Sequence, residues 1–136
     1  MKHALIAFLV LITLTANKCA QPMPDSAALL EKKWVFQTIG GERLNLPDKA
    51  EAPWLKLSED KLMGFGGCNA LFGSYTVEGD KLSFSNVGGT KKYCEGIQPT
   101  ENAVKEVLGK VESFKLGDGV VKLMGGGNEL AELRGE

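Results

Sequence analysis

Cys68 and Cys94 are the residues of this 136-residue chain best suited to covalent chemistry. They could form a structural disulfide, act as a redox pair or bind a metal. The Cys-x-x-Cys spacing of a redox motif is absent, and the single histidine, His3, lies at the N-terminus, so two thiols alone make a poor metal site. A disulfide would close a loop of about 26 residues and stabilise the fold by about 3 kcal/mol. The sequence favours this structural disulfide, with no metal site and no cofactor.

Gly66, Gly67 and Asn69 surround the first of these cysteines and form a second candidate site. Successive amides in glycine-rich turns can form a backbone nest that binds an anion. The alternative is a bulge or tight bend at a corner of a sheet, capped by Asn69. This bend is favoured because no basic side chain is adjacent in the sequence. All three residues remain candidate binding residues beside that structural interpretation.

Aromatic and acidic residues offer further candidates. Trp34 and Trp54 could form an aromatic pair for a ligand, but Trp34 starts an alternating run and is expected in the core. Trp54 follows a proline and is expected to be half exposed, which makes it the candidate binding residue. Acids such as Glu51 and Glu59 could do acid/base chemistry, but they lie in predicted turns, where acids are common. We therefore expect no catalytic residue and no enzyme.

The charge balance restricts the possible partners. Sixteen Lys and Arg residues against 17 Asp and Glu residues give a formal net charge of -1. This balance lacks the excess of positive charge that nucleic acids or an anionic membrane surface would attract. We expect a monomer that binds no nucleic acid and reaches a membrane only through an N-terminal lipid anchor, with an envelope protein or a hydrophobic ligand as its partner.

The first 18 residues have the layout of a signal peptide. Lys2 and His3 precede an apolar run at residues 4–14, which is too short to span a bilayer. Cys19 is the candidate lipid attachment site, although Asn17 and Lys18 precede it where small residues are preferred. The alternative is cleavage after Ala16, which places Leu14 where a small residue is also preferred. Residues 19–29 contain two prolines and are predicted to form a tether. The domain is predicted at residues 30–136, in the periplasm or anchored to the outer membrane.

From residue 32 onward, short apolar runs alternate with Gly, Asp and Asn, which predicts antiparallel strands joined by tight hairpins. One amphipathic helix is expected at residues 99–110, with Thr100 as its cap and Gly109 near its end. Its apolar stripe, Ala103, Val104, Val107 and Leu108, should cover one face of the sheet. The predicted fold is mainly β, a strongly curved antiparallel sheet or incomplete barrel of about eight short strands. The predicted strands are 33–39, 54–58, 61–65, 71–77, 81–87, 111–116, 120–124 and 130–133.

Several short motifs together resemble the META domain, also called the HslJ-like family. The most specific is Gly67-Cys68-Asn69 followed some twenty residues later by Thr90-x-x-x-Cys94. The resemblance covers about residues 30–133 and implies a curved antiparallel sheet with one packed helix. The other matching elements are Trp34 to Gly41, Gly64 to Phe65, Gly73 to Tyr75, Gly79 to Phe84 and Glu101 to Val104.

The resemblance implies a function, but the family offers no catalytic residues that could be assigned to this sequence. Members of the family are mostly exported or lipid-anchored bacterial proteins linked to heat shock and antibiotic tolerance. We therefore expect a non-enzymatic envelope protein that acts as a stress-related binding or assembly module. The alternative is a carrier, similar to secretin pilot proteins, that shelters an acyl chain or hydrophobic peptide between its sheet and its helix.

Overall fold

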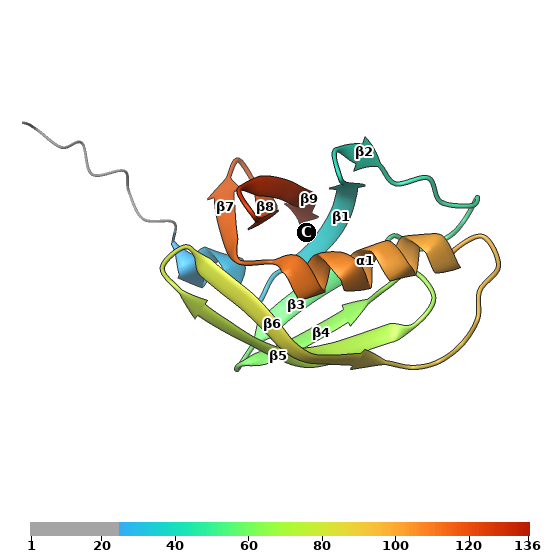
Figure 1. The fold of residues 1–136 in the computed structure, drawn as a ribbon, viewed down its shortest axis with the longest axis horizontal. Helices are drawn as coiled ribbons and strands as arrows, with labels where there is room; N and C mark the ends of the chain where they lie inside the picture. Colours follow the sequence, from blue (N-terminus) through green and yellow to red (C-terminus); the bar gives the residue numbers. More distant parts are fainter. Residues whose placement is uncertain (1–24) are drawn as a thin grey trace, which may run out of the picture.

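Alternating buried and exposed residues form nine antiparallel strands in the computed structural model, which describes residues 25–136 (Figure 1). The predicted signal peptide, Cys19 and most of the predicted tether lie outside these residues. All eight predicted strands are present, and β2 is additional. The strands are β1 (Lys33–Ile39), β2 (Glu42–Arg43), β3 (Trp54–Ser58), β4 (Lys61–Phe65), β5 (Ala70–Glu78), β6 (Lys81–Gly89), β7 (Ser113–Gly117), β8 (Val120–Gly125) and β9 (Asn128–Gly135).

The strands follow one another around a ring-like curved sheet. Neighbours pair in the order β2-β1-β3-β4-β5-β6-β7-β8-β9, and β1 also pairs with β9. The weakest junction is between β6 and β7, which share the single paired position Lys81 and Ser113. The predicted fold, a strongly curved antiparallel sheet with one packed helix, is therefore confirmed.

The helix α1 (Gln98–Lys110) lies beside β6 and faces the layer of β7 to β9 (Figure 1). Val104, Val107 and Leu108 are buried, so most of the predicted apolar stripe enters the core. Ala103 is only partly buried, and Glu101 occupies a buried position instead. Burying such a stripe is what holds a helix of this length on a sheet.

The helix ends at Lys110 as predicted, but the predicted roles of Thr100 and Gly109 need correction. The N-cap residue is Ile97, which makes no side-chain capping bond, and Thr100 lies inside the helix. The helix continues past Gly109 to Lys110, and the N–H of Val111 donates to the carbonyl of Val107. The proline at the second helical position suits a helix start, because its missing N–H would have no partner there anyway.

The packed part of the chain begins before Leu30, the first residue of the predicted domain. Ser26–Leu29 form a 3-10 helix, and Leu29 is buried in the core. The indole N–H of Trp34 donates to the carbonyl of Leu29 at 2.8 Å, and the N–H of Glu31 donates to the carbonyl of Leu57. These bonds place the start of the described chain beside β3.

Candidate functional site

The glycine-rich corner at residues 66–69 joins β4 to β5, and all four of its residues are buried. Gly67 has φ of +112°, a conformation that L side chains rarely adopt. A Cβ atom at Gly66 would lie 2.8 Å from Cγ of Glu101, so the close approach of the helix also requires glycine at this position. The predicted bend is present, and it lies directly under α1.

The carboxylate of Glu101 fills the backbone nest of this corner. The backbone N–H groups of Cys68 and Asn69 donate to Oε2 of Glu101 at 3.1 and 2.7 Å. The side-chain amide of Asn69 donates to Oε1 at 2.7 Å, and Nζ of Lys105 lies 3.0 Å from the same oxygen. The side chain of Glu101 is fully buried. The anion of this nest is therefore supplied by the chain itself.

Two opposing effects set the pKa of Glu101. Burial disfavours the charged form and raises the pKa, whereas hydrogen bonds from Asn69, Lys105 and Cys68 favour the charged form and lower it. The hydrogen bonds outweigh burial, and the pKa lies below its usual value. The group is therefore a carboxylate near neutral pH, which is the state that its four donors require.

Asn69 also fixes the loop that follows β6. Its side-chain amide donates to the carbonyl of Lys92 at 2.9 Å, and its Oδ1 accepts bonds from the hydroxyl of Thr90 and the N–H of Lys92. A disulfide between Cys68 and Cys94 ties the same loop to the same corner, which confirms the predicted pairing. Asn69 and the disulfide therefore hold together the corner, the loop and the helix.

This arrangement changes the role of three candidate binding residues. Gly66, Gly67 and Asn69 are buried, and the donors of the nest are already used by Glu101. An external anion would have to displace that carboxylate. The interpretation as a structural bend fits the geometry better than the interpretation as an anion-binding site.

The two tryptophans point to opposite faces of the sheet and do not form a pair. Trp34 is 2% exposed in the core, whereas Trp54 is half buried on the outside, as their positions on β1 and β3 predict. The indole N–H of Trp54 donates to Oε1 of Glu51 at 2.9 Å, and Nζ of Lys33 lies 5.4 Å from the centre of its ring. Trp54 therefore remains available for an external contact.

Trp54 belongs to an apolar surface that the sequence analysis missed. Met63 of β4 and Phe72 of β5 are direct cross-strand partners, and each is 54% exposed. Phe65, half buried, is the cross-strand partner of Trp54. Strand alternation places these four side chains on the outside of the sheet. We refer to Trp54, Met63, Phe65 and Phe72 as the outer apolar face.

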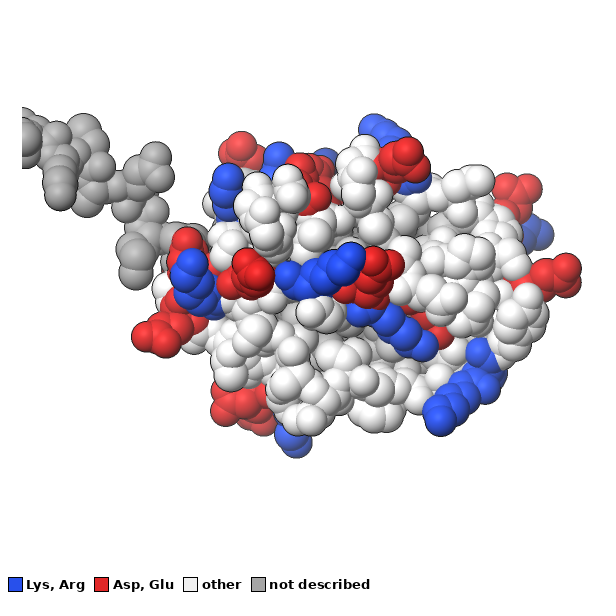
Figure 2. Space-filling model, in the orientation of Figure 1, with Lys and Arg blue, Asp and Glu red and all other residues white. Residues whose placement is uncertain are grey.

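Charged side chains line the visible side of α1. Figure 2 shows them along the helix and around the rim of the view, while the surface over β5 and β6 between them is largely uncharged. The helix carries the ion pairs of Lys105 with Glu101 and of Lys110 with Glu106, both at i,i+4 spacing. The pair of Lys110 with Glu106 is exposed on both sides and contributes little to stability, whereas the pair of Lys105 with Glu101 joins a partly exposed lysine to a buried carboxylate.

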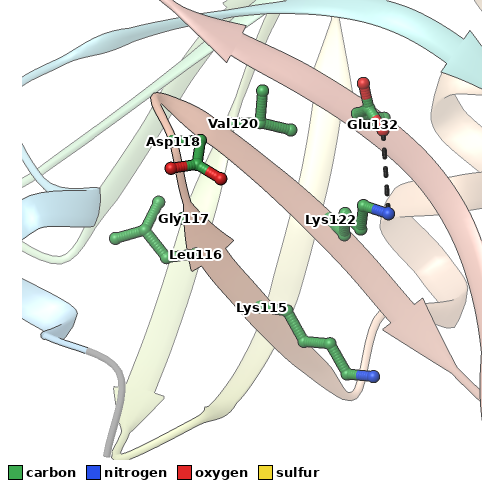
Figure 3. Close-up of a pocket in the computed structure, with 7 residues that line it drawn as sticks. All are labelled: Lys115, Leu116, Gly117, Asp118, Val120, Lys122 and Glu132. Carbon is green, nitrogen blue, oxygen red and sulfur yellow. Dashed lines mark ion pairs between the residues drawn. The ribbon is translucent and has the colours of Figure 1, made fainter.

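A hollow of about 460 Å³ lies on the outside of β7 to β9 (Figure 3). Nζ of Lys122 lies 3.8 Å from Glu129 and 3.9 Å from Glu132, so its charge is already paired. The side chain of Lys115 extends away from this group in Figure 3. Binding pockets usually hold a few convergent polar groups, and the two that converge in this hollow, Lys122 and Glu132, are already paired with each other.

Neither the interior nor the seam of α1 with β1 and β9 offers much space. The core cavity lined by Leu29, Trp34 and Leu133 holds about 10 Å³. A hollow of about 190 Å³ lies between α1 and the sheet, lined by Ile39, Val107 and Leu130 among others. Ligand pockets commonly measure about 300–1,000 Å³. Among residues 25–136, no three His, Cys, Asp or Glu side chains are grouped as a metal site, and no helix is long and apolar enough to cross a membrane.

Comparisons with known proteins agree with this architecture. A family model described as META domain matches residues 27–135. An NMR structure of a protein from Burkholderia xenovorans has a TM-score of 0.66 and 25% identity, over 85% of this chain and 90% of that one. A second NMR structure has a TM-score of 0.65 and 17% identity, over 82% of this chain and 95% of that one. None of the curated proteins matches the chain.

Proposed function

Because this chain belongs to the META domain family, we propose that it is an exported, non-enzymatic binding or assembly module of the bacterial envelope that docks through its outer apolar face. The observation that carries the proposal is the exposure of Met63 and Phe72, each at 54%. Exposed apolar side chains that lie together commonly mark interaction sites. The resemblance to HslJ-like proteins supports a role under stress.

The disulfide supports the proposed location. Disulfides persist in oxidising compartments such as the periplasm and are rare in the bacterial cytosol. The bond between Cys68 and Cys94 therefore agrees with export of the chain. It also supports the non-enzymatic part of the proposal, because neither sulfur is left as a free nucleophile.

The carrier hypothesis receives less support from the geometry. An acyl chain would need an internal space far larger than the core cavity of about 10 Å³. The hollow of about 190 Å³ beside α1 lies at the expected place but is small, and Glu106 and Lys110 form part of its wall. A partner bound on the outside of the sheet requires no opening of the core.

Site-specific photocrosslinking in the native host tests the proposal. A photoreactive amino acid replaces Phe72 on the outer apolar face or, as the control, Lys115 on the outside of β7, and both sites are exposed. We expect crosslinks to another envelope component from position 72 and few from position 115. Equal crosslinking from both positions, or crosslinking from position 115 alone, would contradict the proposal. An intact disulfide in each variant checks that the domain is folded.

A further inference from the structure

We infer that the outer apolar face docks on the surface of an anionic phospholipid bilayer; this inference rests on the proposed function and names its partner. The face is built from two cross-strand rows. One row joins Val35, Trp54, Phe65 and Ala70, and the next joins Lys33, Lys56, Met63, Phe72 and Gly88. Aromatic residues and methionine thus lie directly beside lysines.

The shape of this surface favours a bilayer over an extended peptide. Peptides commonly add a strand to a free sheet edge or lie in a groove. Both edges of β4 are already paired, with β3 and with β5, so the centre of the face offers no free edge. The hollows described above lie on other parts of the molecule. A fluid surface that adapts to exposed side chains fits this face better.

The local charges favour anionic headgroups, although the net charge of the chain is close to zero. Lys56 is the cross-strand partner of Met63, and Lys61 points to the same side two residues before it. Neither lysine forms an ion pair within residues 25–136. Three acids border the face, and each has a partner of its own. Lys33 lies 3.3 Å from Glu136, the indole N–H of Trp54 donates to Glu51, and the hydroxyl of Ser58 donates to Glu31.

The N-terminal end of the described residues lies beside the outer apolar face. Glu31 bonds to Leu57 on β3, the strand that carries Trp54 and Lys56. The sequence predicts a lipid on Cys19, and the stretch from Cys19 to Asp25 can span at most about 20 Å. A lipid at that position would hold the Leu57 end of β3 close to a bilayer. Aromatic residues and lysines are the side chains that favour a membrane interface.

Vesicle binding by residues 20–136 tests the inference. This fragment contains the whole core, which extends from Leu29 to Leu133, and lacks the apolar leader. Vesicles of phosphatidylglycerol and phosphatidylethanolamine should shift the fluorescence of Trp54 to shorter wavelengths. Trp34 is already buried and serves as a constant background. Vesicles of phosphatidylcholine should bind more weakly because they carry no net charge.

Matched variants separate the apolar and the electrostatic contributions. The double variant Met63→Ser/Phe72→Ser should lose the fluorescence shift with both kinds of vesicle. Each lysine near a charged bilayer is worth about fivefold in binding, so Lys56→Gln/Lys61→Gln should bind anionic vesicles about thirtyfold more weakly. Tyr93→Ser, which removes an exposed aromatic residue from the loop after β6, should bind as wild type.

The outcomes distinguish the inference from the proposed function. No fluorescence shift with any vesicle overturns the bilayer as the partner. If photocrosslinks from position 72 then identify a protein, the outer apolar face remains the docking surface and its partner is that protein. If position 72 yields neither lipid nor protein crosslinks and no vesicle binds, both proposals are wrong. Equal binding by Lys56→Gln/Lys61→Gln and wild type would overturn the preference for anionic lipids.

Discussion

The corner at residues 66–69 and the outer apolar face belong to the same part of the sheet, around β4 and β5, but they use their side chains in opposite ways. At the corner, the polar groups of Cys68, Asn69 and Glu101 bond to one another and are buried. On the outer apolar face, Met63 and Phe72 are exposed and contribute little to the core. Polar residue types that suggest binding can thus serve the fold alone, whereas Met63 and Phe72 leave half of their surface free for a partner.

This comparison gives predictions that separate stability from binding. Changes at the corner should lower the free energy of unfolding, because buried donors and a crosslink depend on one another there. Changes on the outer apolar face should alter binding with little effect on unfolding. A loss of binding after a change at the corner, or a loss of stability after a change on the outer apolar face, would contradict this assignment.

The largest effect is expected for Glu101→Ala. The variant leaves the N–H groups of Cys68 and Asn69 and the amide of Asn69 buried without their acceptor, at a cost of about 3–5 kcal/mol. Glu106→Ala is the matched control, since Glu106 is also a helix glutamate paired with a lysine four residues on, but it is exposed. The control should leave stability almost unchanged, because an exposed ion pair of this kind contributes little. Urea unfolding measures the free energy of unfolding of both variants. Equal losses in the two variants would show that the hydrogen bonds of the nest do not stabilise the fold.

The next effect concerns the disulfide between Cys68 and Cys94. Replacing both residues with serine should cost about 3 kcal/mol, because the bond closes a loop across a sequence separation of 26 and restricts the unfolded chain. Thermal melting with and without reductant measures the loss. The wild type should melt at lower temperature in reductant, and the double variant should melt alike in both. Binding through the outer apolar face should persist at low temperature, and its loss would show that the corner has a functional role.

A smaller effect is expected from pH. The pKa of Glu101 is lower in the folded chain than its ordinary value of 4.5, so the folded state favours the charged form. Its contribution to stability is complete well above pH 4.5 and is lost as the pH falls through the lowered folded pKa. The stability difference between wild type and Glu101→Gln should therefore shrink on acidification. Unfolding midpoints at a series of pH values check this, and a difference independent of pH would contradict it.

The sequence predicted the sheet well because strands and hairpins have local signals. The turn at Glu59 and Asp60, where both residues have positive φ, lies where the sequence placed a tight hairpin. β2 was missed because two residues, Glu42 and Arg43, are too short to show an alternating pattern. The resemblance to the META domain, now supported by the match over residues 27–135, implied the same curved sheet with one packed helix.

The sites were harder to predict because their partners lie far apart in the sequence. Glu101 and Asn69 are separated by 32 positions, and an acid in the first turn of a helix is usually explained by the helix dipole. One signal was present, since Glu101 lies three residues before Val104 and seven before Leu108, on the buried side of the helix. Met63 and Phe72 were missed because each follows another apolar residue, Leu62 or Leu71. The sequence alone therefore does not show which of the two neighbours points into the core.

The smallest effect on stability and the clearest effect on binding are expected for Met63→Ser/Phe72→Ser. These side chains are 54% exposed, and surface substitutions of this kind usually change the free energy of unfolding by about 0.5 kcal/mol or less. Serine removes the apolar surface that a partner would cover while it keeps a residue that strands tolerate. The variant should melt close to wild type, keep its disulfide and lose binding through the outer apolar face. A large loss of stability with intact binding would reverse the comparison: Met63 and Phe72 would then support the sheet, and the docking surface would have to lie elsewhere on the molecule.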